Sequence, residues 1–179
     1  MDDIKRIDRQ LAYSGKILDI YKDTMRFSNG NTEEWDYVAH RKGAAAVIPV
    51  LPDGKIILVR QYRNALNRET IEIPAGAKNF AGEDSLLCAS RELEEETGYK
   101  PGKMEPLCTI ATTVAFCNEV VEVFLATDLT KTSQNLDENE FINIETYSLD
   151  ELVDMILKGI IQDSKTVGAI LSYKAKYKS

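Results

Sequence analysis

Apolar residues gather in short runs along the middle of the chain. Residues 44–51 and 55–61 form two such runs, and the turn tripeptide Pro52-Asp53-Gly54 separates them. Two apolar runs around a Pro-Asp-Gly turn predict a β-hairpin. Four further segments have the composition of strands, namely residues 70–73, 107–113, 120–127 and 141–147.

Three segments show a helical pattern instead. Between residues 84 and 97, Leu86, Ala89 and Leu93 fall on one stripe, and Gly98 follows as a stop signal. Ser148 and Glu151 form a capping box that opens a helix to about residue 158, and a last helix begins at 163 or 164. Because strands and helices do not alternate regularly, we expect an α+β fold with a mixed sheet.

The first forty residues are more polar and less regular. Residues 16–27 and 33–40 are β-capable runs around a turn at 28–31, which predicts a hairpin-like piece. Such a piece is too small to bury a core of its own, so it should pack on the main domain or on a second subunit. We therefore expect an N-terminal β subdomain over 1–42 and a main domain over 43–179.

Composition and charge limit the partners of the chain. Its 179 residues are 44% hydrophobic and 28% charged, which is ordinary for one globular domain with a small appendage. The formal charge of -7 gives no general attraction for nucleic acid or an anionic membrane. However, residues 83–96 hold six acids and one base, so most of the excess charge lies in one segment.

Cysteine and histidine content argues against a zinc site. The three cysteines, Cys88, Cys108 and Cys117, have no metal-ligand spacing, and His40 is the single histidine. We expect the cysteines to be small buried residues and His40 to serve packing. The N-terminus lacks the apolar core of a signal peptide, and no stretch approaches the ~18 apolar residues of a membrane span. We expect a soluble, cytoplasmic protein.

The acidic helix is the strongest chemical signal. At about 100° per residue, Glu92, Glu95 and Glu96 share one arc of about 100°, next to the apolar face. These like charges repel one another late in a helix, where the macrodipole also disfavours anions. A hard cation such as Mg²⁺ or Mn²⁺ would relieve both costs, and the nearby Ala75 carbonyl can add an oxygen ligand. The alternative interpretation is a solvated acidic helix face.

These residues resemble the Nudix box, the signature of hydrolases that act on a nucleoside diphosphate linked to another group. The matching positions are Gly76, Glu83 and Arg91-Glu92-Leu93-x-Glu95-Glu96-x-Gly98-Tyr99. One extra residue lies between Gly76 and Glu83, and we expect it to bulge in the loop.

The resemblance extends to the ADP-ribose pyrophosphatase branch of this family. The matching segments are residues 14–21, 59–63, 72–76, 136–141 and 163–166. The resemblance implies a Nudix α/β/α sandwich with an N-terminal β-domain, assembled as a homodimer. It also implies metal-dependent hydrolysis of a nucleoside diphosphate sugar, with ADP-ribose giving AMP and ribose 5-phosphate.

The same resemblance implies roles for individual residues. Glu92 and Glu96 would hold the metal with help from Glu95 and the Ala75 carbonyl, while Arg91 and Glu83 would hold helix and loop together. The acidic loop 137–140 would supply the general base, for which we favour Glu140 over Glu138; its alternative is a solvated turn. Further candidates for contact with metal or substrate are Glu119 and four arginines, Arg41, Arg60, Arg63 and Arg68. For each arginine, the alternative is an ordinary position on the surface.

One difference from the branch concerns the substrate. Val114-Ala115 stands where the branch carries Pro-Gly, in a loop near the terminal group of the substrate. Another nucleotide sugar or a dinucleotide is therefore an alternative substrate. From a different class of function, the chain could be a non-catalytic Nudix domain that senses a nucleotide.

Overall fold

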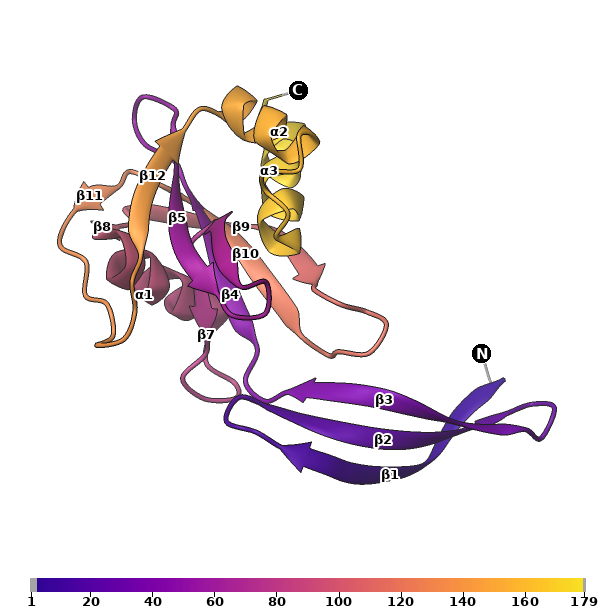
Figure 1. Cartoon of the computed structure of the whole chain (residues 1–179). Helices are drawn as coiled ribbons and strands as arrows, with labels where there is room; N and C mark the ends of the chain where they lie inside the picture. The colour runs from indigo at the N-terminus through magenta and orange to yellow at the C-terminus, as the bar shows by residue number, and fades with distance from the viewer. Residues whose placement is uncertain (1–2, 179) are drawn as a thin grey trace.

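The computed structural model describes residues 3–178, which form a layered body and a separate N-terminal sheet (Figure 1). The body holds a mixed four-stranded sheet in the order β7-β4-β10-β9, in which β4 and β10 are parallel and the other pairs antiparallel. Its strands are β4 (Ala44–Pro49), β7 (Ala75–Ala77), β9 (Lys103–Ala111) and β10 (Val120–Thr127). This pairing confirms the predicted mixed sheet.

A second, antiparallel sheet lies beside the first in the order β12-β5-β6. Its strands are β5 (Ile56–Arg63), β6 (Arg68–Glu72) and β12 (Asn143–Tyr147), and a two-stranded sheet joins β8 (Tyr99–Lys100) to β11 (Thr130–Lys131). The predicted hairpin of residues 44–51 and 55–61 is therefore wrong. Beyond one bridge between Val50 and Ile56, β4 and β5 belong to different sheets.

Helices cover both sides of these sheets, as Figure 1 shows. They are α1 (Ser85–Thr97), α2 (Leu149–Leu157) and α3 (Ser164–Tyr177). On β4, Ala45 and Val47 face α1, whereas Ala46 and Ile48 belong to the larger core that includes α2 and α3. This alternation follows from the two-residue period of a strand and gives the expected α/β/α sandwich. No helix within residues 3–178 has the length and apolar character needed to cross a membrane.

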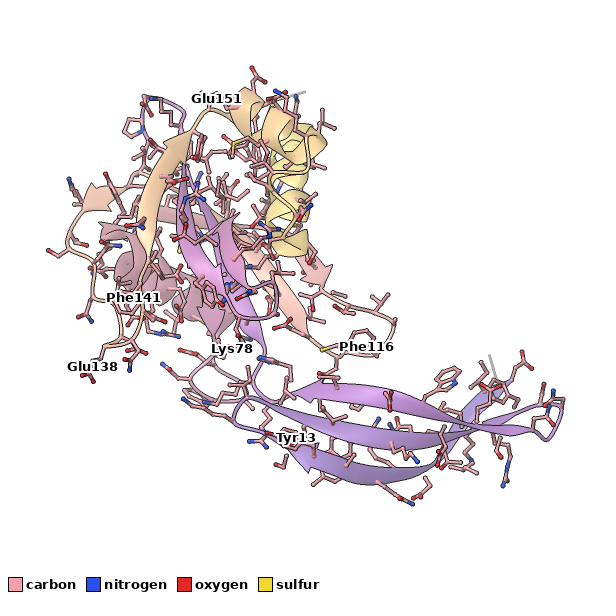
Figure 2. The ribbon with its side chains drawn as sticks, in the orientation of Figure 1. Tyr13, Lys78, Phe116, Glu138, Phe141 and Glu151 are labelled. Atoms are coloured by element: carbon pink, nitrogen blue, oxygen red, sulfur yellow. The ribbon has the colours of Figure 1, made fainter. Side chains whose placement is uncertain are left out.

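The N-terminal sheet has three strands rather than the two predicted. β1 (Ile4–Ser14) pairs with β2 (Leu18–Phe27), and β2 pairs with β3 (Thr32–His40), all antiparallel. β1 is the strand that sequence reasoning missed, because its side chains are almost all exposed and its apolar residues do not recur at every second position. The sheet extends away from the body, and the end of β3 meets the loop after β9, where the Val38 N–H donates to the Phe116 carbonyl at 2.7 Å (Figures 1 and 2).

Candidate active site

Helix α1 is fixed at both ends by side-chain and backbone caps. The Asp84 carboxylate accepts hydrogen bonds from the Leu86 and Leu87 N–H groups at 2.9 and 3.0 Å. Gly98 ends the helix with a φ of 67°, a conformation that glycine adopts without strain. Because Ala89 and Leu93 are fully buried against the sheet, the adjoining face directs the glutamates toward β7.

Gly76 on β7 lies directly beneath one of these glutamates. A Cβ atom at this position would lie 2.0 Å from the Glu92 carboxyl carbon, so only glycine leaves room for that carboxylate. On the neighbouring residue, the Ala75 N–H donates to Glu96 Oε2 at 3.1 Å. The loop and the helix therefore meet through Glu92 and Glu96.

The glutamates open into a polar hollow of about 440 Å³. Its walls come from β5, β7, α1 and the acidic loop before β12. The lining residues are Gln61, Arg63, Ala75, Gly76, Ala77, Asn79, Arg91, Glu92, Glu95, Glu96, Asn135, Asp137 and Glu140. The predicted metal ligands thus share one hollow with Glu140, the favoured base.

Burial leaves this hollow with unbalanced negative charge. Glu96 is 5% exposed; burial, and then the charges of Glu92 and Glu140, raise its pKa to about 8. Burial also raises the pKa of Glu92, although Arg91 opposes the shift. A raised pKa means that the ionised carboxylate is costly in this hollow. A bound cation would stabilise that ionised form.

Arg91 partly neutralises the glutamates. Its Nη1 donates to Glu92 Oε1 at 2.7 Å and to Glu95 Oε2 at 3.0 Å. Its Nη2 donates to the Ala77 carbonyl at 3.2 Å and lies 3.8 Å from Glu83, which in turn accepts from the Asn79 N–H at 2.6 Å. Arg91 and Glu83 therefore hold the helix to the loop that carries the extra residue.

The donor set suits a hard divalent ion, because it consists of carboxylate and carbonyl oxygens. The side chains of residues 3–178 do not place three acidic, histidine or cysteine ligands around one point. Instead, Glu92 and Glu95 turn toward Arg91. Metal binding would therefore compete with Arg91 for these two carboxylates.

The acidic loop reaches the hollow because it is tied to the end of α1. The Gln134 side chain donates to the Glu96 carbonyl at 2.7 Å, and the Asn135 N–H donates to the Glu95 carbonyl at 3.0 Å. This attachment brings Glu140 to the wall of the hollow, whereas Glu138 lies outside the lining at the outer tip of the loop (Figure 2). The two candidate bases are thus in different surroundings.

A second hollow of about 460 Å³ adjoins the first and shares Arg63 and residues 75–77 with it. Glu119 lines this second hollow and accepts a hydrogen bond from Thr112 Oγ1 at 2.8 Å. His40 also lines it; its Nδ1 accepts from the Gly43 N–H at 3.1 Å, and its Nε2 lies 3.7 Å from Glu119. Glu119 and Arg63 therefore face the same space beside the glutamates.

The other three candidate arginines lie elsewhere. Arg41 pairs with Asp19 at the base of the N-terminal sheet, with Nη2 2.5 Å from Oδ1. Arg60 pairs with Glu145 on β12, with Nε 2.6 Å from Oε1. Arg68 donates to the Gln162 side chain at 2.6 Å and does not itself line either hollow.

Sequence reasoning gave no role to Glu72 and Lys165, which both line the second hollow. Glu72 is 2% exposed, and its carboxylate accepts hydrogen bonds from Arg63, Thr70 and Lys165. Burial alone would raise its pKa, but these donors outweigh burial and lower the pKa to about 2. The signal available in the sequence was an acid between two isoleucines in the predicted strand 70–73.

Comparison with known proteins identifies the family and the fold of the chain. The chain is 40% identical to the methanol dehydrogenase activator of Bacillus methanolicus and 38% identical to the ADP-ribose pyrophosphatase of Bacillus subtilis, each over 93% of this chain and 90% of the relative. A crystal structure of an ADP compounds hydrolase superposes with a TM-score of 0.87 at 18% identity, covering 100% of this chain and 98% of that one, which shows the fold. The NUDIX domain model matches residues 40–167. The chain therefore belongs to the NUDIX family.

Proposed function

We propose that the chain hydrolyses the diphosphate of a nucleoside diphosphate sugar, with ADP-ribose converted to AMP and ribose 5-phosphate. The observation that carries this proposal is the hollow in which Glu92, Glu95 and Glu96 of α1 meet Glu140 beside Arg63. The name of the Bacillus subtilis relative, which matches over nearly the full length of both chains, supports the choice of substrate.

Nudix hydrolases generally use a divalent metal, and we propose Mg²⁺ for this chain, with Mn²⁺ as a substitute. Glu92, Glu95, Glu96 and the Ala75 carbonyl would hold it, since they supply oxygen ligands in a buried, negatively charged hollow. When bound, the ion polarises phosphoryl oxygens and lowers the pKa of water. It would also reverse the sign of a hollow that by itself repels a diphosphate.

We propose Glu140 as the general base. It lines the same hollow as Glu92 and Glu96, and its charge raises the pKa of both. In this position Glu140 can accept the proton of a water that attacks phosphorus. Arg63 would contact the phosphate oxygens, and Glu119 the remainder of the substrate in the second hollow.

The substrate beyond the diphosphate has a second candidate. Val114 and Ala115 lie in the loop that bonds to β3, where Phe116 and Asn118 exchange backbone hydrogen bonds with Val38. This loop differs from the Pro-Gly of the branch, and the Bacillus methanolicus relative carries a name that states no substrate. Another nucleotide sugar or a dinucleotide is therefore the alternative.

A substrate panel tests both candidates. The chain with Mg²⁺ is given ADP-ribose, other nucleoside diphosphate sugars and dinucleotides, and the products are identified by chromatography. We expect AMP and ribose 5-phosphate from ADP-ribose at the highest kcat/KM. Binding of ADP-ribose with no Mg²⁺-dependent hydrolysis of any compound would contradict the proposal and favour a nucleotide sensor.

Two variants of α1 distinguish the loss of a proposed metal ligand from the loss of one negative charge on the helix. Glu96→Gln removes a proposed ligand and should lower kcat by about two orders of magnitude or more while the fold is kept. Glu94→Gln removes the same charge from the same helix at a residue outside the hollow, so it should keep nearly full activity. Equal activity in the two variants would remove the metal assignment.

We propose that residues 1–42 mediate a homodimer. The described residues of this region expose several large apolar side chains: Ile4, Leu11, Tyr13 and Trp35 on the strands and Ile17 in the turn between β1 and β2. Exposed large apolar residues favour association, and the body covers only one end of this sheet. A second copy of the chain is the partner that we expect to cover the rest.

We also propose a cytoplasmic location. Cys88, Cys108 and Cys117 are free thiols. A chain with three unpaired cysteines suits a reducing compartment, where thiols stay reduced.

A further inference from the structure

The charge cluster around Glu72 lies just behind the proposed phosphate contact. The Glu72 carboxylate accepts two hydrogen bonds from Arg63, from Nε to Oε1 at 2.7 Å and from Nη2 to Oε2 at 2.6 Å. The two residues therefore form a bidentate pair. Lys165 Nζ bonds Oε2, and Thr70 Oγ1 bonds Oε1 at 2.6 Å. With four donors and 2% exposure, this carboxylate has little freedom to move.

The pair leaves one side of the guanidinium available. Within residues 3–178, Arg63 donates from Nε and Nη2 and makes no hydrogen bond from Nη1. The Arg63 side chain is 42% exposed, lines both hollows and is close enough to Glu96 for their charges to act on each other. Nη1 is therefore a free donor between the glutamates and the second hollow.

We propose that Glu72 is a positioning residue that fixes the Arg63 guanidinium at the junction of the two hollows, where Nη1 meets the diphosphate. The inference rests on the proposed function, because it assumes a diphosphate in the glutamate hollow. An unpaired arginine would lose side-chain entropy when a ligand ordered it. Glu72 imposes that order before the substrate arrives, which favours binding.

Glu72→Gln tests the positioning role, because glutamine cannot accept the two bonds of a bidentate pair. We expect kcat/KM for ADP-ribose to fall about tenfold, mainly through a higher KM. The Kd of the non-hydrolysable α,β-methylene analogue with Mg²⁺, measured by calorimetry, should rise by a similar factor. An unchanged KM and Kd would overturn the proposal.

A double-mutant cycle shows whether Glu72 acts through Arg63. In an Arg63→Lys background, which already lacks the bidentate pair, Glu72→Gln should change kcat/KM by less than about threefold. The same tenfold loss in both backgrounds would mean that Glu72 supports the fold in general, which would overturn the proposal.

Glu145→Gln is the matched control for stability. Glu145 on β12 makes a bidentate pair with Arg60, which lies on β5 as Arg63 does. Neither Glu145 nor Arg60 lines either hollow. We expect a lower thermal midpoint, as in Glu72→Gln, with KM within about twofold of the parent. If Glu145→Gln raises KM as much as Glu72→Gln does, lost stability explains both effects and the proposal fails.

Inorganic pyrophosphate with Mg²⁺ distinguishes failure of this inference from failure of the proposed function. If the chain hydrolyses no nucleotide but binds pyrophosphate, and Glu72→Gln weakens that binding, the positioning role stands without the substrate assignment. If the chain binds neither pyrophosphate nor ADP-ribose, both proposals fall.

Discussion

The absence of a side chain at Gly76 is what allows the Glu92 carboxylate to reach β7. Because an added Cβ would lie 2.0 Å from the carboxyl carbon, Gly76→Ala must displace either Glu92 or the strand. We expect a loss of at least about tenfold in activity, since displacements near 1 Å can cost more than that. The measurement is kcat/KM with Mg²⁺, with circular dichroism as the check on folding. Full activity in Gly76→Ala would contradict the assignment of Glu92.

Glu96 predicts a pH dependence of metal binding. Its pKa is about 8 in the folded, metal-free chain, against 4.5 ordinarily. The folded state therefore holds this proton more tightly, and the stabilisation it gives below pH 4.5 is lost as the pH rises through 8. Since a cation must displace the proton, Mg²⁺ affinity should increase up to about pH 8, by at most about tenfold per pH unit.

Calorimetric titration of Mg²⁺ between pH 6 and 8.5 measures this dependence. In Glu96→Gln the affinity should be lower and much less dependent on pH, because the titrating group is gone. A flat affinity in the parent chain would show that Glu96 does not exchange its proton for the metal.

At the scale of elements, α1 depends on its N-terminal cap. Asp84 accepts from two N–H groups of the first turn, so Asp84→Ala should cost about 1 kcal/mol of stability. Asp84→Ser keeps a capping oxygen and should cost less. Urea unfolding measures both, and an unchanged midpoint in Asp84→Ala would show that packing of Leu93 and Ala89 alone holds the helix.

The burial of whole strands explains why residues 44–51 and 55–61 do not form the predicted hairpin. β4 and β5 each contain four fully buried residues in a row, Ala45–Ile48 and Ile56–Val59, with no polar face. Strands covered on both sides need neighbours on both edges, and β10 and β12 provide those edges from distant parts of the chain. The local turn at 52–54 joins the two strands with one bridge, between Val50 and Ile56.

At the scale of the whole molecule, the exposed N-terminal sheet predicts the oligomeric state. Light scattering should give twice the 20.1 kDa of one chain. Leu11→Asp combined with Ile17→Asp places charges on residues that are 57% and 59% exposed, and should yield monomers. Leu157→Asp, at an 81% exposed position on α2, is the control and should remain dimeric. A monomeric parent chain would contradict the proposed homodimer.

The charge distribution also acts at this scale. Residues 83–96 carry a net charge of -5 out of -7, and three of their six acids line one hollow together with Arg91. A cation bound there would turn the most repulsive region for a diphosphate into an attractive one.

The sequence by itself determined the features that depend on near neighbours. Asp84, Gly98 and the Ser148–Glu151 capping box fix helix ends through contacts within one turn, and the spacing of Glu92, Glu95 and Glu96 sets their common face. The motif spacing also identified the family, since the box and the helix that carries it lie in one continuous segment.

Only the tertiary structure decided which distant residues meet. It separated Arg63, which lines both hollows, from Arg41, Arg60 and Arg68, and it brought Lys165 to Glu72 across 93 positions of sequence. It likewise placed Glu140 inside the hollow and Glu138 outside it. Such choices rest on sheet order and on where loops attach, and neither leaves a periodic or local signal in the sequence.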